Sequence, residues 1–179
     1  MADCISYDCT DDLGNHLLNT CGVESLGGLK DIIILECNHT LTDPSDGTEV
    51  LAEIAAGTAT LIKNVKIGVP AASPIKSAAL IACSSDTVRN YDRTLNWVDG
   101  NMNENNIQLY NNLLGGQVKG GAILHGCGTD EVTWINSPIS FEGSRVIPDT
   151  DDDAQHFAIT GMWKEVTEGS IYSTPVGVF

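Results

Sequence analysis

Hydrophobic residues in this chain recur with two spacings, and the shorter spacing dominates. Alternating or short β-branched apolar runs bounded by turn residues predict strands. Runs of this kind cover residues 29–37, 59–69, 77–83, 91–98, 117–124, 131–135, 139–146 and 155–166. Pro70 and Pro74 are expected to end the second strand, because proline cannot donate a hydrogen bond to a neighbouring strand.

The longer, helical spacing appears first at residues 48–56, where apolar residues recur four positions apart. Asp46 or Thr48 is suited to cap the start of a helix there, and Gly57 stands where a left-handed residue commonly ends one. The pattern therefore predicts a short helix that begins after the turn-forming residues 43–47.

A second helical pattern covers residues 103–114. Ile107, Tyr110 and Leu114 share one face, and Asn103 is a suitable N-cap. With many short strands and only two short helices, the chain is expected to be mainly β. We predict an antiparallel β-sandwich or partly closed barrel, with the helices flanking it.

The ends of the chain differ in pattern from the middle. Residues 1–29 show neither alternation nor a sustained helical stripe, so they are expected to form an irregular N-terminal arm. Residues 30–169 are predicted to form a single folded domain, and 42% hydrophobic residues in 179 suffice for a sizeable core.

Charge narrows the classes of function. The chain has 9 Lys and Arg against 24 Asp and Glu, a net charge of −15. Residues 1–29 contain five acids and no base, and residues 130–179 contain nine acids and two bases. This balance argues against a protein that binds DNA or RNA by neutralising phosphates. The acidic ends are either solvated faces or a surface that must not adhere to an anion.

Targeting signals are not evident in the sequence. No apolar run approaches the roughly 20 residues of a spanning helix, so no membrane anchor is expected. The first residues have neither the basic region nor the apolar region of a secretory signal. We therefore expect synthesis and folding in the cytoplasm of the producing cell.

Motifs for catalysis are also missing, and no catalytic, cofactor-binding or metal-binding residue is assigned. The sequence has no nucleophile elbow, P-loop, dinucleotide fingerprint or zinc-protease motif. His16, His39, His125 and His156 are scattered and are expected to have structural or surface roles. His125 stands near Cys127 in a glycine-rich turn, so a cysteine–histidine pair is conceivable there.

The six cysteines do not match a zinc site, because none are spaced as C-x-x-C. Buried thiols are favoured over a disulfide framework, although bridges involving Cys4, Cys9 or Cys21 remain an alternative in an oxidising environment. Residues 149–153 place acids like a calcium loop, but Ala154 stands where that loop needs glycine, so a solvated loop is favoured. The sequon at Asn38 has no meaning without secretion.

Several stretches resemble structural proteins of tailed bacteriophages, particularly those of Bacteroidetes-type hosts. These stretches are AAG at 55–57, NVKIGVPAASP at 64–74, YDRTLNWVDGN at 91–101, NIQLYNNL at 106–113 and FEGSRVIPD at 141–149. The resemblance covers roughly residues 46–179. Within that group, the layout is similar to major tail-tube proteins.

This resemblance implies a virion protein in the phage tail that forms stacked, hexameric rings around a channel for DNA. The partners it implies are further copies of the chain and other tail proteins, with DNA passing unbound. It implies that the helix at 103–114 flanks the sheet and that residues 1–29 and 170–179 are arms reaching neighbouring subunits. An acidic, base-poor wall would let DNA slide, because few cations would hold its phosphates.

Three other interpretations stay open. The first is a capsid decoration or head-fibre protein, expected to be trimeric. The second is an enzyme or ligand-binding sandwich, which predicts that His125, Cys127 and the loop 149–153 meet in one cleft. The third is a secreted, disulfide-rich adhesin.

Overall fold

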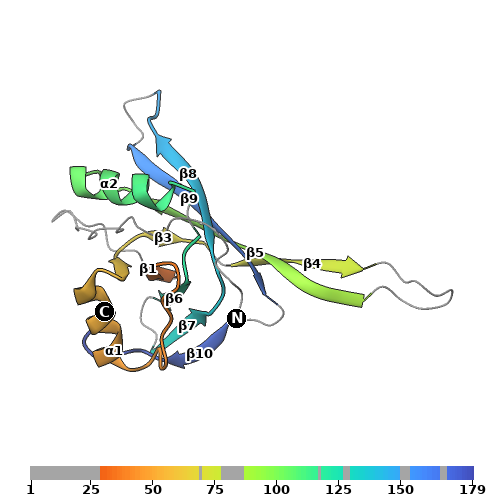
Figure 1. The fold of residues 1–179 in the computed structure, drawn as a ribbon. Coiled ribbons are helices and arrows are strands. Elements are labelled where there is room, and N and C mark those ends of the chain that lie inside the picture. The colour runs from red at the N-terminus through yellow and green to blue at the C-terminus, as the bar shows by residue number, and fades with distance from the viewer. Residues whose placement is uncertain are drawn as a thin grey trace.

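A computed structural model describes residues 29–68, 70–77, 87–116, 118–126, 130–149, 154–165 and 169–179. Figure 1 shows a central sheet with two helices on one side and a long hairpin projecting from the other. The described strands are β1 (Leu29–Leu35), β2 (Ala59–Ile62), β3 (Lys66–Ile67), β4 (Ala71–Ser77), β5 (Thr87–Asp99), β6 (Gly121–Gly126), β7 (Glu131–Ile135), β8 (Ser140–Val146), β9 (His156–Glu165) and β10 (Ser170–Ser173). The described helices are α1 (Gly47–Ala56) and α2 (Glu104–Leu113).

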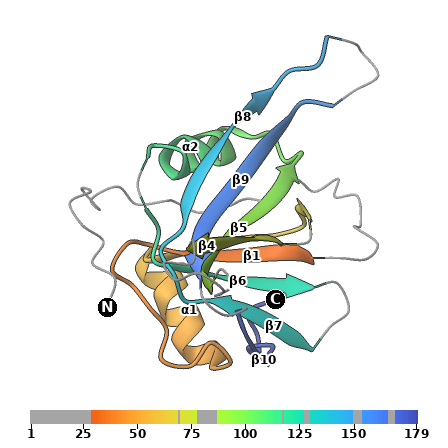
Figure 2. The ribbon, with the colours of Figure 1, turned by 90° about the vertical axis from the view of Figure 1, so that its right-hand side faces the viewer.

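The strands form one antiparallel sheet that bends into two layers. Their order is β10-β7-β6-β1-β3-β5-β9-β8, with β2 added beside β1 and β4 beside β5. Figure 2 shows β8, β9 and β5 crossing the layer of β1, β6 and β7 at a steep angle. The mainly β, antiparallel fold with two short helices is confirmed. The path of described strands has two ends, so the sheet is not closed into a barrel.

Strand β1 explains how one sheet builds two cores. Ile32 and Ile34 face the core between the two layers, where α2 also packs. Ile33 and Leu35 face a second core, which α1 and the end of the chain cover. A strand covered on both faces must be apolar at successive positions, and this accounts for the unbroken run in its sequence.

Helix α1 begins and ends as its sequence predicts. The Asp46 side chain accepts a hydrogen bond from the Thr48 backbone N–H at 2.8 Å, so Asp46 is the N-cap. Gly57 ends the helix with φ of +78°, a left-handed conformation that glycine adopts at low cost. The helix therefore has a strong stop signal at the expected residue.

Helix α2 also forms where predicted, with Asn103 as its N-cap. The buried face differs from the prediction, because Leu109, Tyr110 and Leu113 are buried while Ile107 and Leu114 are only partly buried. Tyr110 packs on Phe157 of β9, and its hydroxyl accepts a hydrogen bond from Trp97 of β5. The face turned toward these strands therefore carries Leu109, Tyr110 and Leu113.

Two strand predictions are wrong. Residues 59–69 form two strands, because Asn64 adopts φ of +55° and its backbone N–H donates to Asp31 Oδ1 at 3.0 Å, which turns the chain between β2 and β3. Pro74 does not end a strand but lies inside β4, opposite Tyr91. Among the described strands, β4 pairs with β5 alone, so Pro74 does not interrupt a ladder on a second side there. Most of the predicted strand at 77–83 lies outside the described residues.

The end of the chain packs against its own domain. Strand β10 was not anticipated, and it pairs with β7 from Ser170↔Trp134 to Ser173↔Glu131. Val178 is 3% exposed and belongs to the core beneath α1. The segment 170–179 is therefore docked on the described domain, whereas the N-terminal arm predicted for residues 1–29 lies almost entirely outside the described residues.

Candidate functional site

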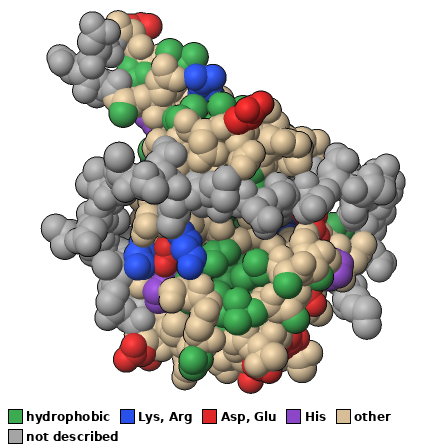
Figure 3. Space-filling model, turned by 90° about the vertical axis from the view of Figure 1, so that its left-hand side faces the viewer, with side chains coloured by type: hydrophobic (Ala, Val, Ile, Leu, Met, Phe, Trp, Pro, Cys, Tyr) green, Lys and Arg blue, Asp and Glu red, His purple; other side chains and the backbone are tan. Residues whose placement is uncertain are grey.

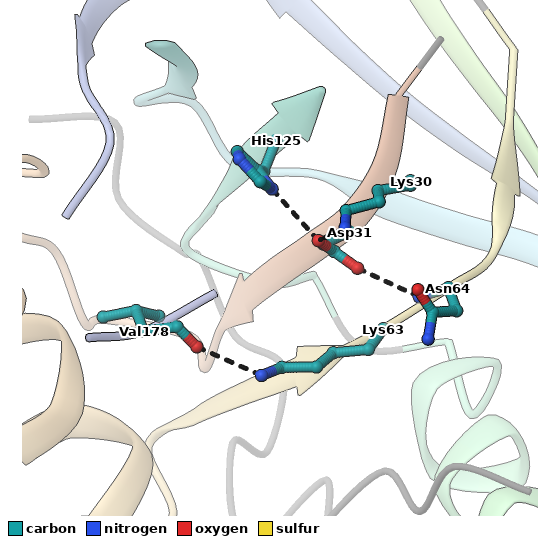
Figure 4. Close-up of polar contacts among 6 residues, drawn as sticks. All are labelled: Lys30, Asp31, Lys63, Asn64, His125 and Val178. Atoms are coloured by element: carbon teal, nitrogen blue, oxygen red, sulfur yellow. Dashed lines mark hydrogen bonds and ion pairs between the residues drawn. The ribbon is translucent and has the colours of Figure 1, made fainter. Parts of the chain in front are cut away.

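His125 lies on β6 beside an aspartate of β1. Its Nδ1 is 3.0 Å from Oδ2 of Asp31, and both side chains are at least nine-tenths buried. Because an ionised carboxylate can only accept, the Nδ1–H group donates this hydrogen bond. Asp31 also accepts from the Asn64 backbone, and Lys30 Nζ lies 3.7 Å from its Oδ2 (Figure 4). Asp31 thus joins β1, β6 and the turn after β2.

The end of the chain completes this cluster. The ring of Phe179 stacks on the His125 imidazole, with 4.2 Å between centroids and 18° between planes. Lys63 Nζ donates to the backbone carbonyl of Val178 at 3.2 Å, as Figure 4 also shows. Among the described residues, no hydroxyl or thiol is hydrogen-bonded to the imidazole. The Asp31–His125 pair therefore links β1 to β6. Its neighbours hold the turn after β2 and Phe179 against the same two strands.

The groups proposed for an enzymatic cleft are not gathered in the described structure. His125 contacts Asp31 and Phe179, whereas Asp149 lines a separate cleft with His156 near the β8–β9 tip. Cys127 and residues 150–153 lie outside the described residues, as does His16. His39 Nδ1 lies 3.3 Å from Glu53 Oε2, and His156 Nδ1 lies 3.0 Å from the Ala154 carbonyl.

Metal-ligand geometry gives no candidate either. Within the described ranges, no group of three or more His, Cys, Asp and Glu side chains could hold a metal ion. Cys37 is buried at the end of β1 with 3% exposure. Neither described helix is long and apolar enough to span a lipid bilayer.

The surface that stands out chemically is the outer face of β8, β9 and β5, seen in Figure 2. Its rows of cross-strand neighbours are Ser144–Ala158–Val98, Glu142–Thr160–Asn96 and Ser140–Met162–Thr94. These residues are exposed or partly exposed, and none belongs to either core. The face is polar and is built mainly from small side chains.

Charge on this outer face is nearly balanced. Lys164 and Asp92 are opposite each other, with 3.9 Å between Nζ and Oδ1, and both are exposed. Lys66 of β3 lies opposite Val98 and so belongs to the same face. Glu142 of β8 is the other acidic residue on this face. Thr160 Oγ1 donates to Asn96 Oδ1 at 2.7 Å across the centre of the face. The face therefore offers no cluster of cations to an approaching phosphate chain.

A long hairpin adjoins this face. Strands β4 and β5 pair from Ala71↔Thr94 to Ser77↔Thr87, and Figure 1 shows them leaving the body of the domain. Their outward half is neither covered by a helix nor paired beyond these two strands among the described elements. Residues 71–74 of β4 are exposed, so this hairpin is suited to contact another molecule.

The opposite side of the domain carries exposed apolar residues. Leu51 on α1 is 44% exposed, and Val176 beside the start of α1 is 87% exposed. Figure 3 faces this side and shows hydrophobic side chains gathering at its centre. Surfaces of this composition are typical of contacts between proteins.

Comparison with known proteins adds no relative. No family model matches the sequence, and neither a curated protein nor a solved structure matches the chain.

Proposed function

We propose that the chain is a virion structural protein that assembles into stacked rings and forms the tube of a phage tail. In this proposal six copies surround a channel through which DNA passes without specific binding. The outer face of β8, β9 and β5 lines the channel, and the β4–β5 hairpin contacts a neighbouring copy.

The observation that carries this proposal is the outer face with its balanced charge. A channel wall must tolerate a polyanion without holding it, because each unpaired cation that meets a phosphate slows passage. On this face Lys164 has Asp92 opposite, and the central pair is the uncharged Thr160 and Asn96. The remaining charge of the chain, which is strongly negative, also opposes tight contact with DNA.

The second support for this proposal is that the domain carries two surfaces suited to contacts between subunits. Closed rings need head-to-tail contacts between different patches of one subunit. The projecting hairpin and the apolar side with Leu51 and Val176 are two such patches on different parts of the domain.

Electron microscopy of the purified full chain at high concentration tests the assembly. We expect rings or stacked tubes in negative stain, and a mass of six subunits by sedimentation. A trimer would instead favour the decoration or head-fibre alternative. A persistent monomer over the whole concentration range would contradict the proposal.

A charge substitution tests the channel face itself. Thr160→Lys places an unpaired cation in the centre of the face, and we expect rings to form normally while genome release slows in virions built with the variant. Gln108→Lys adds the same charge to an exposed position on α2 and should release DNA as the wild type does. Equal release rates for both variants would place the channel on another face.

A further inference from the structure

A cleft of about 270 Å³ opens at the edge of the core between the two layers of the sheet. Arg93 of β5 and Trp163 of β9 line it from one layer, and Leu124, Thr133, Ile135 and Ile171 line it from β6, β7 and β10 in the other. Its walls are largely apolar, and Ile171 is 67% exposed. The cleft is separate from the cluster around His125 and from the outer face of β8, β9 and β5.

Arg93 is unusual for a buried arginine. The residue is 8% exposed, and its Nε is buried without a hydrogen-bond partner among the described residues. Its nearest carboxylate is Glu165, at 3.7 Å between Nε and Oε2, which is too long for a hydrogen bond. The ring of Tyr91 lies 5.5 Å from the guanidinium carbon. Nε thus loses water without gaining a hydrogen bond in return, which is costly.

Glu165 does not relieve this deficit, because its Oε2 lies too far from Nε to accept a hydrogen bond. Its Oε2 accepts a hydrogen bond from Trp163 Nε1 at 3.1 Å. The acid therefore balances part of the charge of Arg93 but leaves its Nε donor unpaired among the described residues. Arginine donors of this kind match a carboxylate, which can accept two parallel hydrogen bonds.

We propose that this cleft binds a carboxylate carried on an apolar group, and that the carboxylate comes from a second copy of the chain. The apolar walls fit the carbon skeleton, and the Arg93 donors fit the anionic end. A singly charged carboxylate suits the cleft better than a phosphate dianion, because Glu165 would repel a second negative charge.

A second copy is the occupant that the charge balance favours. Each copy has 24 acids and 9 Lys and Arg, so its surface carries carboxylates that its own cations cannot pair. The exposed Ile171 beside the cleft would also be covered by an approaching protein. This inference rests on the proposed function only in requiring that copies of the chain meet.

The chemistry of the cleft is tested first with a small probe. We would titrate the purified full chain with 3-phenylpropionate by calorimetry and repeat the titration with Arg93→Met. We expect binding to the wild type and at least tenfold weaker binding to the variant. The control is Arg145→Met, which removes an exposed arginine that is hydrogen-bonded to Gln155 and should leave binding unchanged.

Circular dichroism of the wild type and of Arg93→Met checks that weaker binding does not result from misfolding. Methionine fills a volume similar to that of the arginine stem, and Glu165 keeps its hydrogen bond from Trp163, so the variant is expected to fold. Absence of probe binding to the wild type, or equal binding to folded Arg93→Met, would overturn the site.

The source of the carboxylate is tested by self-association. Sedimentation over a range of concentrations should show that Arg93→Met and an excess of 3-phenylpropionate each weaken assembly about tenfold, while Arg145→Met does not. Assembly that is unchanged by both would overturn the second copy as the occupant, and rings could still form as proposed. A wild type that never associates would contradict both the ring and this occupant, while the titration would still decide whether Arg93 binds a carboxylate.

Discussion

Two buried cations in this fold, Lys119 and Arg93, are handled in opposite ways. The Lys119 side chain is 0% exposed, and its Nζ donates to Glu36 Oε2 at 2.9 Å. Arg93 is almost as buried, but its Nε has no hydrogen-bond partner among the described residues, where its neighbours are the Tyr91 ring and the Glu165 carboxylate at 3.7 Å. Burial by itself therefore does not tell a structural charge from one that is available for binding. The distance to the partner carboxylate, and whether it accepts a hydrogen bond, make that distinction.

The difference has a physical basis in desolvation. Removing either partner of a close buried ion pair leaves the other charged and dry, which is strongly destabilising. A buried charge without hydrogen bonds has already lost its solvation, so replacing it with an apolar side chain removes a cost. The two sites should therefore respond very differently to the same substitution.

The largest effect is expected for Lys119→Met. This variant leaves Glu36 charged and buried at the end of β1, so the free energy of unfolding should fall by about 3–5 kcal/mol. Urea denaturation followed by tryptophan fluorescence measures the change. Adding Glu36→Leu to Lys119→Met should recover most of the loss. A double variant no more stable than the single one would show that the pair matters for another reason.

The next effect concerns Tyr110 on α2. Its hydroxyl donates to the buried Asp99 at 2.7 Å, and Tyr110→Phe should lower stability by about 1–3 kcal/mol at neutral pH, because the carboxylate loses that donor. Thermal unfolding measures this loss. Asp99 keeps its hydrogen bond from the Asn101 backbone, so the variant should still fold.

Alkaline pH sharpens the same test. Burial, followed by the neighbouring negative charge of Asp99, raises the pKa of Tyr110 above its ordinary value of 10.0. Above that pH the unfolded chain releases this proton while the folded chain keeps it, so stability falls as pH rises. The fall should be smaller in Tyr110→Phe. Parallel pH profiles for the two proteins would argue against a retained proton.

A small effect is expected for Arg93→Met, in contrast to Lys119→Met. Its stability should stay within about 1 kcal/mol of the wild type or rise, because the buried Nε makes no hydrogen bond that would be lost. The same urea denaturation measures it. A loss of several kcal/mol would place Arg93 with Lys119 as a structural cation.

The smallest effect is expected for Lys164→Ala on the outer face of β9. Its partner Asp92 is 3.9 Å away and both side chains are exposed, so stability should change by less than about 0.5 kcal/mol. Thermal unfolding at low and high salt should give the same small difference. A change above 1 kcal/mol would mean that this exposed pair is held more rigidly than its separation implies.

Much of the fold could be predicted from local patterns. The continuous apolar run of β1, the alternation of β5 and β9 and the capping residues of both helices are each legible within about ten residues, because they follow from strand and helix periodicity. Strand β4 could not be anticipated, since Pro74 normally argues against a strand. Only its position beside a single neighbour makes it tolerable.

The candidate sites were partly visible in the same patterns. The alternation of β5 already put Arg93 on the side of Leu95 and Trp97, which is a cation on an inward face. Asp31 likewise interrupts an apolar run. The partners of these residues could not be read from the sequence, because Glu165 and His125 are more than 70 positions away along the chain.

The sequence by itself determined most of the strands, both helices, the apolar character of β1, β5 and β9, and that the protein carries a large excess of negative charge. The tertiary structure alone decided which buried charges meet a partner, that the end of the chain packs back on the domain, and that the outer face of β8, β9 and β5 is nearly neutral. The reason is that periodicity acts between near neighbours, whereas ion pairs and the charge of a surface depend on strands that are distant in sequence and adjacent in space.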